Sequence, residues 1–185
     1  MNTTSAQDYP EKWVEAARLE DGTLICIRPI RPDDAPRLQD TFKLLSRQTV
    51  YLRFLETFKE LTDEQAQKFA NVDYLHRMAF VGTIQQSGVE HIIGVARYDT
   101  HSRDHCHEAE CAVVVRDDYQ GLGLGRLLMT RLVQYAQQHE VHTFIGTILM
   151  YNAKVMNFIR GSGLPYERDM IEPGVWDVRV SLPKK

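Results

Sequence analysis

The chain has 185 residues, of which 43% are hydrophobic and 25% charged, and this fits one globular domain with a substantial core. Its formal net charge of −3, with Lys and Arg scattered along the chain, disfavours a nucleic-acid-binding protein, which needs a basic patch. No apolar run reaches membrane-spanning length and the first residues lack secretory-signal features, so we expect a cytoplasmic protein that does not enter a membrane.

The first half of the chain predicts a polar, helix-tolerant extension over residues 1–20, followed by the domain proper over residues 21–185. Asp21-Gly22 is a turn that leads into strand-forming residues. Thr62-Asp-Glu-Gln65 is a capping box, which marks a helix start. In chain order we predict a strand over 23–30, a helix beginning at 32–36, a loop over 46–54, a helix over 63–71, and strands over 77–84 and 91–98 joined by a hairpin at 86–88.

The second half begins with a polar loop over 99–107 and then a central strand that ends at Arg116-Asp-Asp118. The uninterrupted β-branched residues Val113, Val114 and Val115 suit a strand that is covered on both faces. From Leu124 onward, apolar residues recur at helical spacing, which predicts a helix with one buried stripe. The remaining predicted elements are a strand over 142–148, a short helix over 152–160, and closing strands over 164–171 and 175–182.

The turn between the central strand and this helix is rich in glycine, at Gly121, Gly123 and Gly125. Backbone N–H groups in a first helical turn have no intrahelical partner and carry the positive end of the helix dipole. Glycines without Cβ atoms let an anion approach these groups closely. The sequence therefore predicts a pyrophosphate-binding turn, although glycines can also serve only close packing of a helix on a sheet.

Spacing separates the possible nucleotide motifs. The dinucleotide pattern G-x-G-x-x-G fails, because its third glycine would fall on Arg126 or Leu128, and the phosphate-loop pattern fails as well. Gln120-x-x-Gly123-x-Gly125, placed between a strand and a helix, resembles the Q/R-x-x-G-x-G/A signature of the GNAT superfamily of acyl-CoA-dependent N-acyltransferases. The order of predicted elements is also similar to that superfamily, which implies an α/β fold with a mixed, mostly antiparallel central sheet flanked by helices.

Several segments resemble one subgroup of that superfamily, the catalytic domain of bacterial protein lysine acetyltransferases. The resemblance covers nearly the whole chain and implies acetyl-CoA as the donor and a protein lysine as the acceptor. In that subgroup the domain is often fused to a regulatory domain, whose behaviour we do not carry over to this chain. The matching segments are Tyr9-Pro10, Asp21-Gly22, Ile27-Arg-Pro-Ile-Arg-Pro-Asp33, Ser46 with Val50-Tyr-Leu-Arg-Phe54, Val72-Asp-Tyr74, Met78-Ala-Phe80, Gly94-Val-Ala-Arg-Tyr98 and Ala109-Glu-x-Ala-Val-Val-Val-Arg-Asp-Asp118.

The resemblance also implies where the donor lies. Backbone groups of Val113, Val114 and Val115 are expected to pair with the pantetheine arm, and Asn152 to contact that arm, although Asn152 could simply be a helix N-cap. The pyrophosphate is expected on Gln120, Gly121, Leu122, Gly123, Leu124, Gly125 and Arg126. Many GNAT enzymes carry a tyrosine acid where Ile159 stands here, but the subgroup generally lacks it, and a thiol with a pKa near 8.5 leaves readily as a thiolate.

The attacking lysine must lose a proton, which costs about 4.6 kcal/mol at pH 7 for a reference pKa of about 10.4. Glu110 begins the central strand near the expected thioester, where partial burial would raise its pKa toward a useful value. The subgroup has its general base at this place. Without the resemblance, a role for Glu110 in capping the strand or pairing with an arginine is equally expected, and the adjacent Glu108 is the competing base.

Tyr51, Arg53 and Phe54 are predicted on a loop that overlies the acceptor site in this fold, where they shape the lysine entrance or simply fill the core. His101, His105, Cys106 and His107 form a polar cluster without zinc-type spacing, so we predict no metal site. Cys26, Cys106 and Cys111 lack C-x-x-C spacing and are expected to be reduced thiols.

The first functional hypothesis is transfer of acetyl from acetyl-CoA to a protein lysine, with an acyl-CoA synthetase as one candidate acceptor. The alternatives are acetylation of a small amine, such as a polyamine or an antibiotic, and a non-catalytic acyl-CoA sensor. A small polyamine should meet a closed acidic pocket, whereas a sensor should not depend on Glu110. The sequence leaves the acceptor, the acyl-chain preference and the oligomeric state open.

Overall fold

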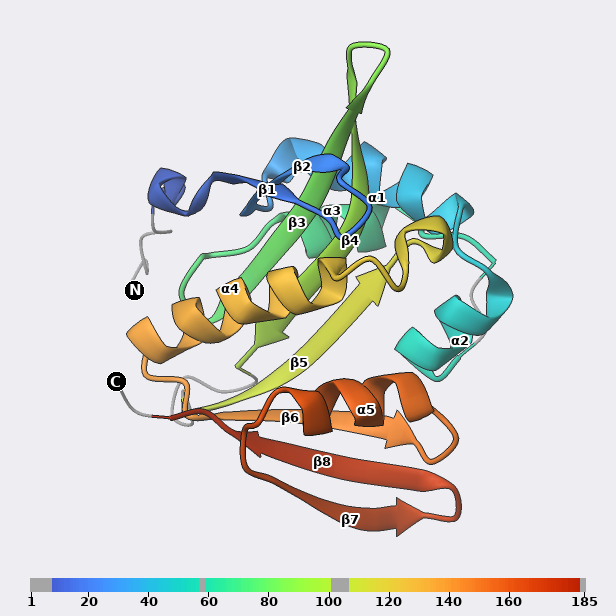
Figure 1. The fold of residues 1–185 in the computed structure, drawn as a ribbon, viewed down its shortest axis with the longest axis vertical. Coiled ribbons are helices and arrows are strands. Elements are labelled where there is room, and N and C mark those ends of the chain that lie inside the picture. The colour runs from blue at the N-terminus through green and yellow to red at the C-terminus, as the bar shows by residue number, and fades with distance from the viewer. Residues whose placement is uncertain (1–7, 57–58, 101–106, 184–185) are drawn as a thin grey trace.

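The computed structural model describes residues 8–56, 59–100 and 107–183 as one continuous sheet with helices on both faces (Figure 1). The strand order is β1-β2-β3-β4-β5-β6-β8-β7, and every neighbouring pair is antiparallel except the parallel pair β5–β6. The strands are β1 (Glu15–Arg18), β2 (Leu24–Pro29), β3 (Arg77–Gln86), β4 (Val89–Asp99), β5 (Glu108–Val115), β6 (Thr143–Leu149), β7 (Tyr166–Glu172) and β8 (Val175–Ser181). The helices are α1 (Ala35–Lys43), α2 (Arg47–Phe54), α3 (Asp63–Ala70), α4 (Leu124–Gln138) and α5 (Ala153–Gly161).

Elements with strong local signals form where the sequence predicts them. The Thr62 side chain accepts the Gln65 N–H, and the Gln65 side chain accepts the Thr62 N–H, which completes the capping box of α3. The β3–β4 hairpin turns at Ser87 and Gly88, both with positive φ (49° and 79°), as a two-residue hairpin requires. The mixed, mostly antiparallel sheet flanked by helices is confirmed.

Two segments differ from their predictions. The segment before Asp21, predicted as a polar, helix-tolerant extension, contains a short 3-10 helix (Glu11–Trp13) and then β1, which pairs antiparallel with β2, and Leu19, at 3% exposure, belongs to the core. The segment after Ser46 is the helix α2 rather than a loop. The Ser46 side chain accepts the Thr49 N–H to begin this helix, and Leu55, with a left-handed φ of 57°, ends it.

The two faces of the sheet bury separate clusters of apolar side chains. Helices α1 and α3 pack on one face, and α4 packs on the other with Leu124, Leu128 and Leu132. Leu124 fits because β3 and β4 carry Gly82 and Gly94 beneath it: a Cβ on Gly82 would lie 2.7 Å from the Leu124 side chain. The glycine-rich turn is therefore fixed to the sheet by the first residue of α4.

Strands β5 and β6 separate after a short stretch of pairing. Only Glu108–Glu110 and Thr143–Ile145 pair, although both strands continue beyond these residues. Figure 1 shows the two strands starting together and diverging toward α2, with α4 and α5 on the same side of the opening. Backbone groups on the β6 side of β5 beyond Glu110 are therefore without a strand partner. No helix in the described ranges is long and apolar enough to cross a membrane.

Candidate active site

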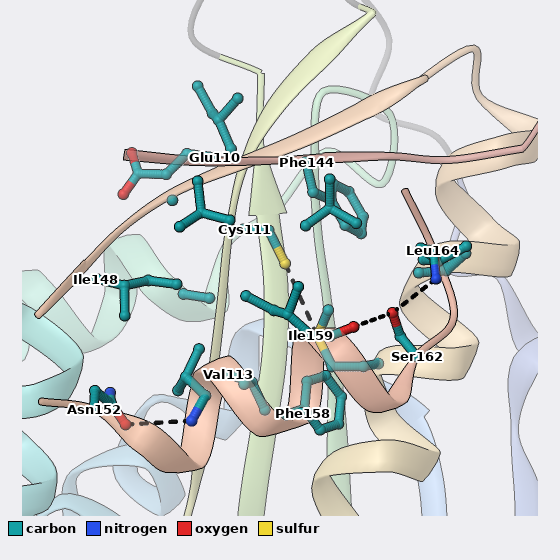
Figure 2. Close-up of a pocket in the computed structure, with 18 of the residues that line it drawn as sticks. Glu110, Cys111, Val113, Phe144, Ile148, Asn152, Phe158, Ile159, Ser162 and Leu164 are labelled. Carbon is teal, nitrogen blue, oxygen red and sulfur yellow. Dashed lines mark hydrogen bonds between the residues drawn. The ribbon is translucent and has the colours of Figure 1, made fainter. Parts of the chain in front are cut away.

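A cavity of about 930 Å³ occupies the opening between β5 and β6. Figure 2 shows Glu110 and Cys111 on β5, with Asn152 and Ile159 at opposite ends of α5. The cavity is lined by one side of α4, by α5, by the diverging strands and by the end of α2. Its volume is in the range of small-molecule and cofactor sites.

Alternation along β5 decides which backbone groups face this cavity. Arg116 N–H donates to the Ile93 carbonyl of β4, so the backbone groups of Val114 also face β4, and those of Val113 and Val115 face the opening. The Val115 carbonyl already accepts a hydrogen bond from Gln120 Nε2 (3.0 Å). The predicted backbone contact with a pantetheine arm thus narrows to Val113, because Val114 is directed to β4.

The glycine-rich turn has the geometry that its sequence predicts. Gly121 and Gly123 have left-handed φ values of 78° and 83°, and Gly123 is the N-cap of α4. The first intrahelical bond runs from Leu127 N–H to the Gly123 carbonyl, which leaves the N–H groups of residues 124–126 without intrahelical partners. The Leu124 side chain is buried in the core, so only its backbone could meet an anion, and Arg126 lines the cavity.

A carboxylate that no sequence motif indicated lies beside this turn. Glu20 Oε1 lies 3.1 Å from where a Cβ on Gly123 would be, and the Glu20 N–H donates to the Leu122 carbonyl (3.2 Å). A pyrophosphate on the turn would therefore approach with a negative charge nearby.

The Gln120 side chain connects three elements around the opening. In addition to its bond with Val115, its Nε2 lies 3.3 Å from Thr49 Oγ1 on α2, and its Oε1 accepts from Lys154 Nζ on α5 (3.0 Å). Gln120 therefore fixes the turn relative to both helices that border the cavity.

Asn152 is the N-cap of α5 and lines the cavity at 7% exposure. Its side-chain oxygen accepts the Val155 N–H (3.3 Å), as the capping interpretation predicts. The side-chain NH₂ is then the group that could donate to a ligand.

Glu110 lies at the last paired position of β5, where the strands begin to separate. Glu110 and Cys111 point to opposite faces of β5, with Cys111 on the α4 side, 3.9 Å from Met129 Sδ. Glu110 is solvent-exposed, so the partial burial predicted from the sequence is absent. The competing carboxylate of Glu108 forms an ion pair with Arg179.

Two arginines bring positive charge to Glu110. Burial lowers the pKa of Arg53, and the negative charge of Glu110 opposes that change. Burial, together with the cations of Arg53 and Arg77, lowers the pKa of Arg97 to about 10, while Asp99 and Glu110 oppose it. Both guanidiniums stay charged at neutral pH, so they attract the Glu110 carboxylate. Arg97 was missed as a site residue, because its proximity to Glu110 depends on pairing between β4 and β5.

The predicted entrance residues divide between the cavity and its rim. Arg53 and Phe54 line the cavity, with the Arg53 guanidinium 4.8 Å from the centre of the Phe54 ring. Phe54 also packs against Phe42 and Phe69 at 6.1 and 6.4 Å, so it is partly a core residue. Tyr51 is 38% exposed and interacts with Tyr151 on the loop before α5.

Of the predicted histidine cluster, the structure describes His107. His101, His105 and Cys106 lie outside the described residues, whereas His107 stacks on His142 with ring centroids 4.8 Å apart. Among residues 8–56, 59–100 and 107–183 there is no group of three or more residues that could hold a metal ion.

Residues 38–164 match the family model described as the acetyltransferase (GNAT) family. The chain belongs to this family. GNAT enzymes use acetyl-CoA as the acyl donor, and this chain is an N-acetyltransferase of that type. The cavity between β5 and β6, with the glycine-rich turn at its border, is therefore the candidate donor site.

Three relatives place the chain within the family. It is 36% identical over 129 residues to Acetyltransferase PA5475 of Pseudomonas aeruginosa, covering 70% of this chain and 67% of that protein. It is 27% identical to Acetyltransferase Pat of Mycolicibacterium smegmatis, covering 90% of this chain but only 48% of that protein. The GNAT domain of PAT from S. lividans superposes with a TM-score of 0.84 at 27% identity, covering 95% of this chain and 100% of that domain.

Proposed function

We propose that this enzyme transfers the acetyl group of acetyl-CoA to the side-chain amine of a lysine in a protein, with Glu110 as the general base. The observation that carries the proposal is the position of Glu110 at the point where β5 and β6 separate. Its side chain faces away from the α4 side of β5, which Cys111 faces. Donor and acceptor can then approach the same point of β5 from opposite faces of the sheet.

In the proposed reaction, Glu110 accepts a proton from the lysine ammonium, directly or through water. The neutral amine attacks the thioester carbonyl, a C–N bond forms, the C–S bond breaks, CoA leaves as a thiolate, and the nitrogen releases its second proton to water. The thiolate needs little assistance from an acid, which is consistent with Ile159 at the position of the tyrosine found in many relatives. The backbone N–H of Val113 is a candidate donor to the pantetheine arm, and the N–H groups of residues 124–126 are candidates for the pyrophosphate.

The surroundings of Glu110 favour a protein acceptor over a polyamine. Glu110 is exposed, and Arg53 and Arg97 add positive charge beside it. A small polycation would be repelled there, whereas a lysine presented on a protein surface brings one amine to an open site. Similarity to Pat and to the GNAT domain of PAT supports the same choice. We propose an acyl-CoA synthetase as one candidate acceptor, and the cytoplasm as the place of action, where free thiols such as Cys26 and Cys111 persist.

The test is to incubate the enzyme with labelled acetyl-CoA and a lysate of its source cells, and then to separate proteins from small molecules. We expect label on protein lysines, located by mass spectrometry, and a strong reduction with the Glu110→Gln variant. Label confined to small amines would contradict the protein acceptor. Equal labelling by the variant and the wild type would contradict Glu110 as the base, and no labelling of either fraction would favour a sensor.

A further inference from the structure

The cavity continues well beyond the position of the reacting carbonyl. Cys111 follows Glu110 on β5 and contacts Met129, so Met129 marks that position on α4. The cavity wall continues along α4 from Met129 through Val133 to Gln137, which is a rise of about 12 Å. An acetyl group would leave most of this length unfilled.

This inner end, which we call the acyl chamber, is walled by apolar side chains from four elements and the segment after α5. Phe144 on β6 and Val180 on β8 are cross-strand partners that form its floor. Figure 2 shows Phe144 and Leu164 on the side of the cavity away from Asn152, with Ile159 nearer the middle, beside Cys111. The chamber residues are Met129, Val133, Phe144, Ile159, Leu164 and Val180.

The polar groups at the border of the chamber bond within the protein. Gln137 Nε2 donates to the Pro183 carbonyl (2.7 Å), and Gln134 Oε1 accepts from Arg131 (2.7 Å). The Ser162 hydroxyl donates to the Ile159 carbonyl (2.6 Å) and accepts the Leu164 N–H (3.2 Å). With these groups engaged, the chamber suits an apolar occupant.

We propose that the acyl chamber binds a linear acyl chain longer than acetyl, so that the donors of this enzyme include butyryl-CoA and hexanoyl-CoA. The inference rests on the donor site proposed above, because the chain enters the chamber attached to the thioester carbonyl. The bonds and protons change in the same way as in acetyl transfer: the lysine nitrogen bonds to the acyl carbon and the C–S bond breaks. Glu110 takes the first proton of the ammonium, the nitrogen releases its second proton to water, and CoA leaves as a thiolate. Each methylene that the chamber buries contributes up to about fourfold in affinity.

The first test compares the affinities of CoA, acetyl-CoA, butyryl-CoA and hexanoyl-CoA by calorimetry, which needs no acceptor. We expect hexanoyl-CoA to bind at least about tenfold more tightly than acetyl-CoA. If CoA and acetyl-CoA bind but the longer acyl-CoAs bind equally or more weakly, the acyl chamber does not bind the chain, whereas the proposed donor site is supported. If none of the four binds, both are wrong.

The second test fills the chamber from α4. Val133→Phe should lower hexanoyl-CoA affinity at least about tenfold and leave acetyl-CoA affinity within about twofold, because the ring takes the space of the chain. Gln138→Phe is the matched control, since it adds the same ring at an exposed position of α4 outside the cavity. Leu164→Phe fills the chamber from the segment after α5 and should act as Val133→Phe does. If either variant retains acetyl-CoA binding and its affinity for hexanoyl-CoA is unchanged, the proposal that the acyl chamber binds the acyl chain is contradicted.

Discussion

The Asp117 carboxylate holds the first turn of α2 by accepting hydrogen bonds from the Ser46 backbone N–H (2.9 Å) and the Ser46 hydroxyl (2.8 Å). The Thr49 hydroxyl donates to the same carboxylate (2.8 Å). Asp117 lies in the turn after β5, directly before the glycine-rich segment, whereas α2 carries Arg53 and Phe54. The segment expected to bind the pyrophosphate is thus tied to the helix that borders the acceptor side.

We predict that Asp117→Asn raises the KM for the acceptor more than the KM for acetyl-CoA, because α2 loses its fixed position. Asp118→Asn is the matched control, since the Asp118 carboxylate pairs with Arg116 rather than holding the first turn of α2. Steady-state kinetics of both variants provide the measurement. Equal effects of the two substitutions on acceptor KM would show that the anchor is not specific to Asp117.

The same anchor should make stability depend on pH. Burial favours the neutral form of the Asp117 carboxyl and raises its pKa. Hydrogen bonds from Ser46 and Thr49 to the carboxylate outweigh burial, so the pKa of Asp117 is lowered. Its contribution to folding is therefore fully present above the unfolded value of about 3.9 and is lost as pH falls through the lower folded value. Because Asp117 is exposed, we expect a difference of at most about 1 kcal/mol between wild type and Asp117→Asn at pH 6. Urea unfolding at pH 6 and pH 3 should show that difference shrinking at the lower pH, and growth of the difference would contradict the assignment.

This anchor also shows what the sequence could not reveal. The α3 capping box and the β3–β4 hairpin depend on residues within a few positions of each other, so local patterns predict them. Helix α2 owes part of its stability to Asp117, 71 positions after Ser46, a contact that no local pattern indicates. Strand β1 pairs with β2 across the Asp21-Gly22 turn, but its residues Glu15–Arg18 include no β-branched or aromatic residue that would mark a strand.

The candidate site also contains residues that sequence motifs predict and residues that only the tertiary structure brings together. Glu110 and the glycine-rich segment were identified from their positions in a recognisable motif. Arg97 and Glu20 reach the site only through strand pairing and chain packing, and the exposure of Glu110 depends on which elements cover β5. The acyl chamber needs α4, α5 and two strands of the sheet to be placed together.

The glycine-rich turn should lose CoA when a negative charge is added at Gly125. A Cβ there would lie 3.7 Å from Val115, an ordinary contact, whereas Gly123 has a left-handed φ and lies beside Glu20. Gly125→Asp therefore keeps the fold and suits the helix dipole, but it repels the pyrophosphate. We expect CoA affinity to fall at least about tenfold by calorimetry, with a smaller loss at high salt. Gly125→Ala is the control for added bulk, and a folded Gly125→Asp variant with unchanged affinity would remove this turn from the site.

Cys111 should not carry the acetyl group during the reaction, even though it lines the cavity. Burial raises the pKa of its thiol to about 12, so only about one molecule in ten thousand is a thiolate at pH 8. We expect Cys111→Ala to retain turnover within about threefold, because direct transfer needs no thiol nucleophile. Cys26→Ala, on β2, controls for loss of a thiol elsewhere. An acetyl adduct on Cys111 in intact-protein mass spectra, together with parallel-line initial-velocity kinetics, would establish a covalent intermediate instead.

The strongest prediction concerns Glu110. Glu110→Gln should keep the fold and CoA affinity but lower turnover by about 10² to 10⁴, the usual contribution of a positioned base. Raising the pH should partly restore the variant, because more of the acceptor lysine is then neutral without help. Glu108→Gln is the matched control: it breaks the ion pair with Arg179 but should leave turnover within about threefold, since Glu108 lies at the far end of the paired stretch of β5. Turnover and its pH profile, measured for the three proteins with the same acceptor, decide the assignment. If Glu110→Gln retains wild-type turnover and Glu108→Gln does not, the base is Glu108.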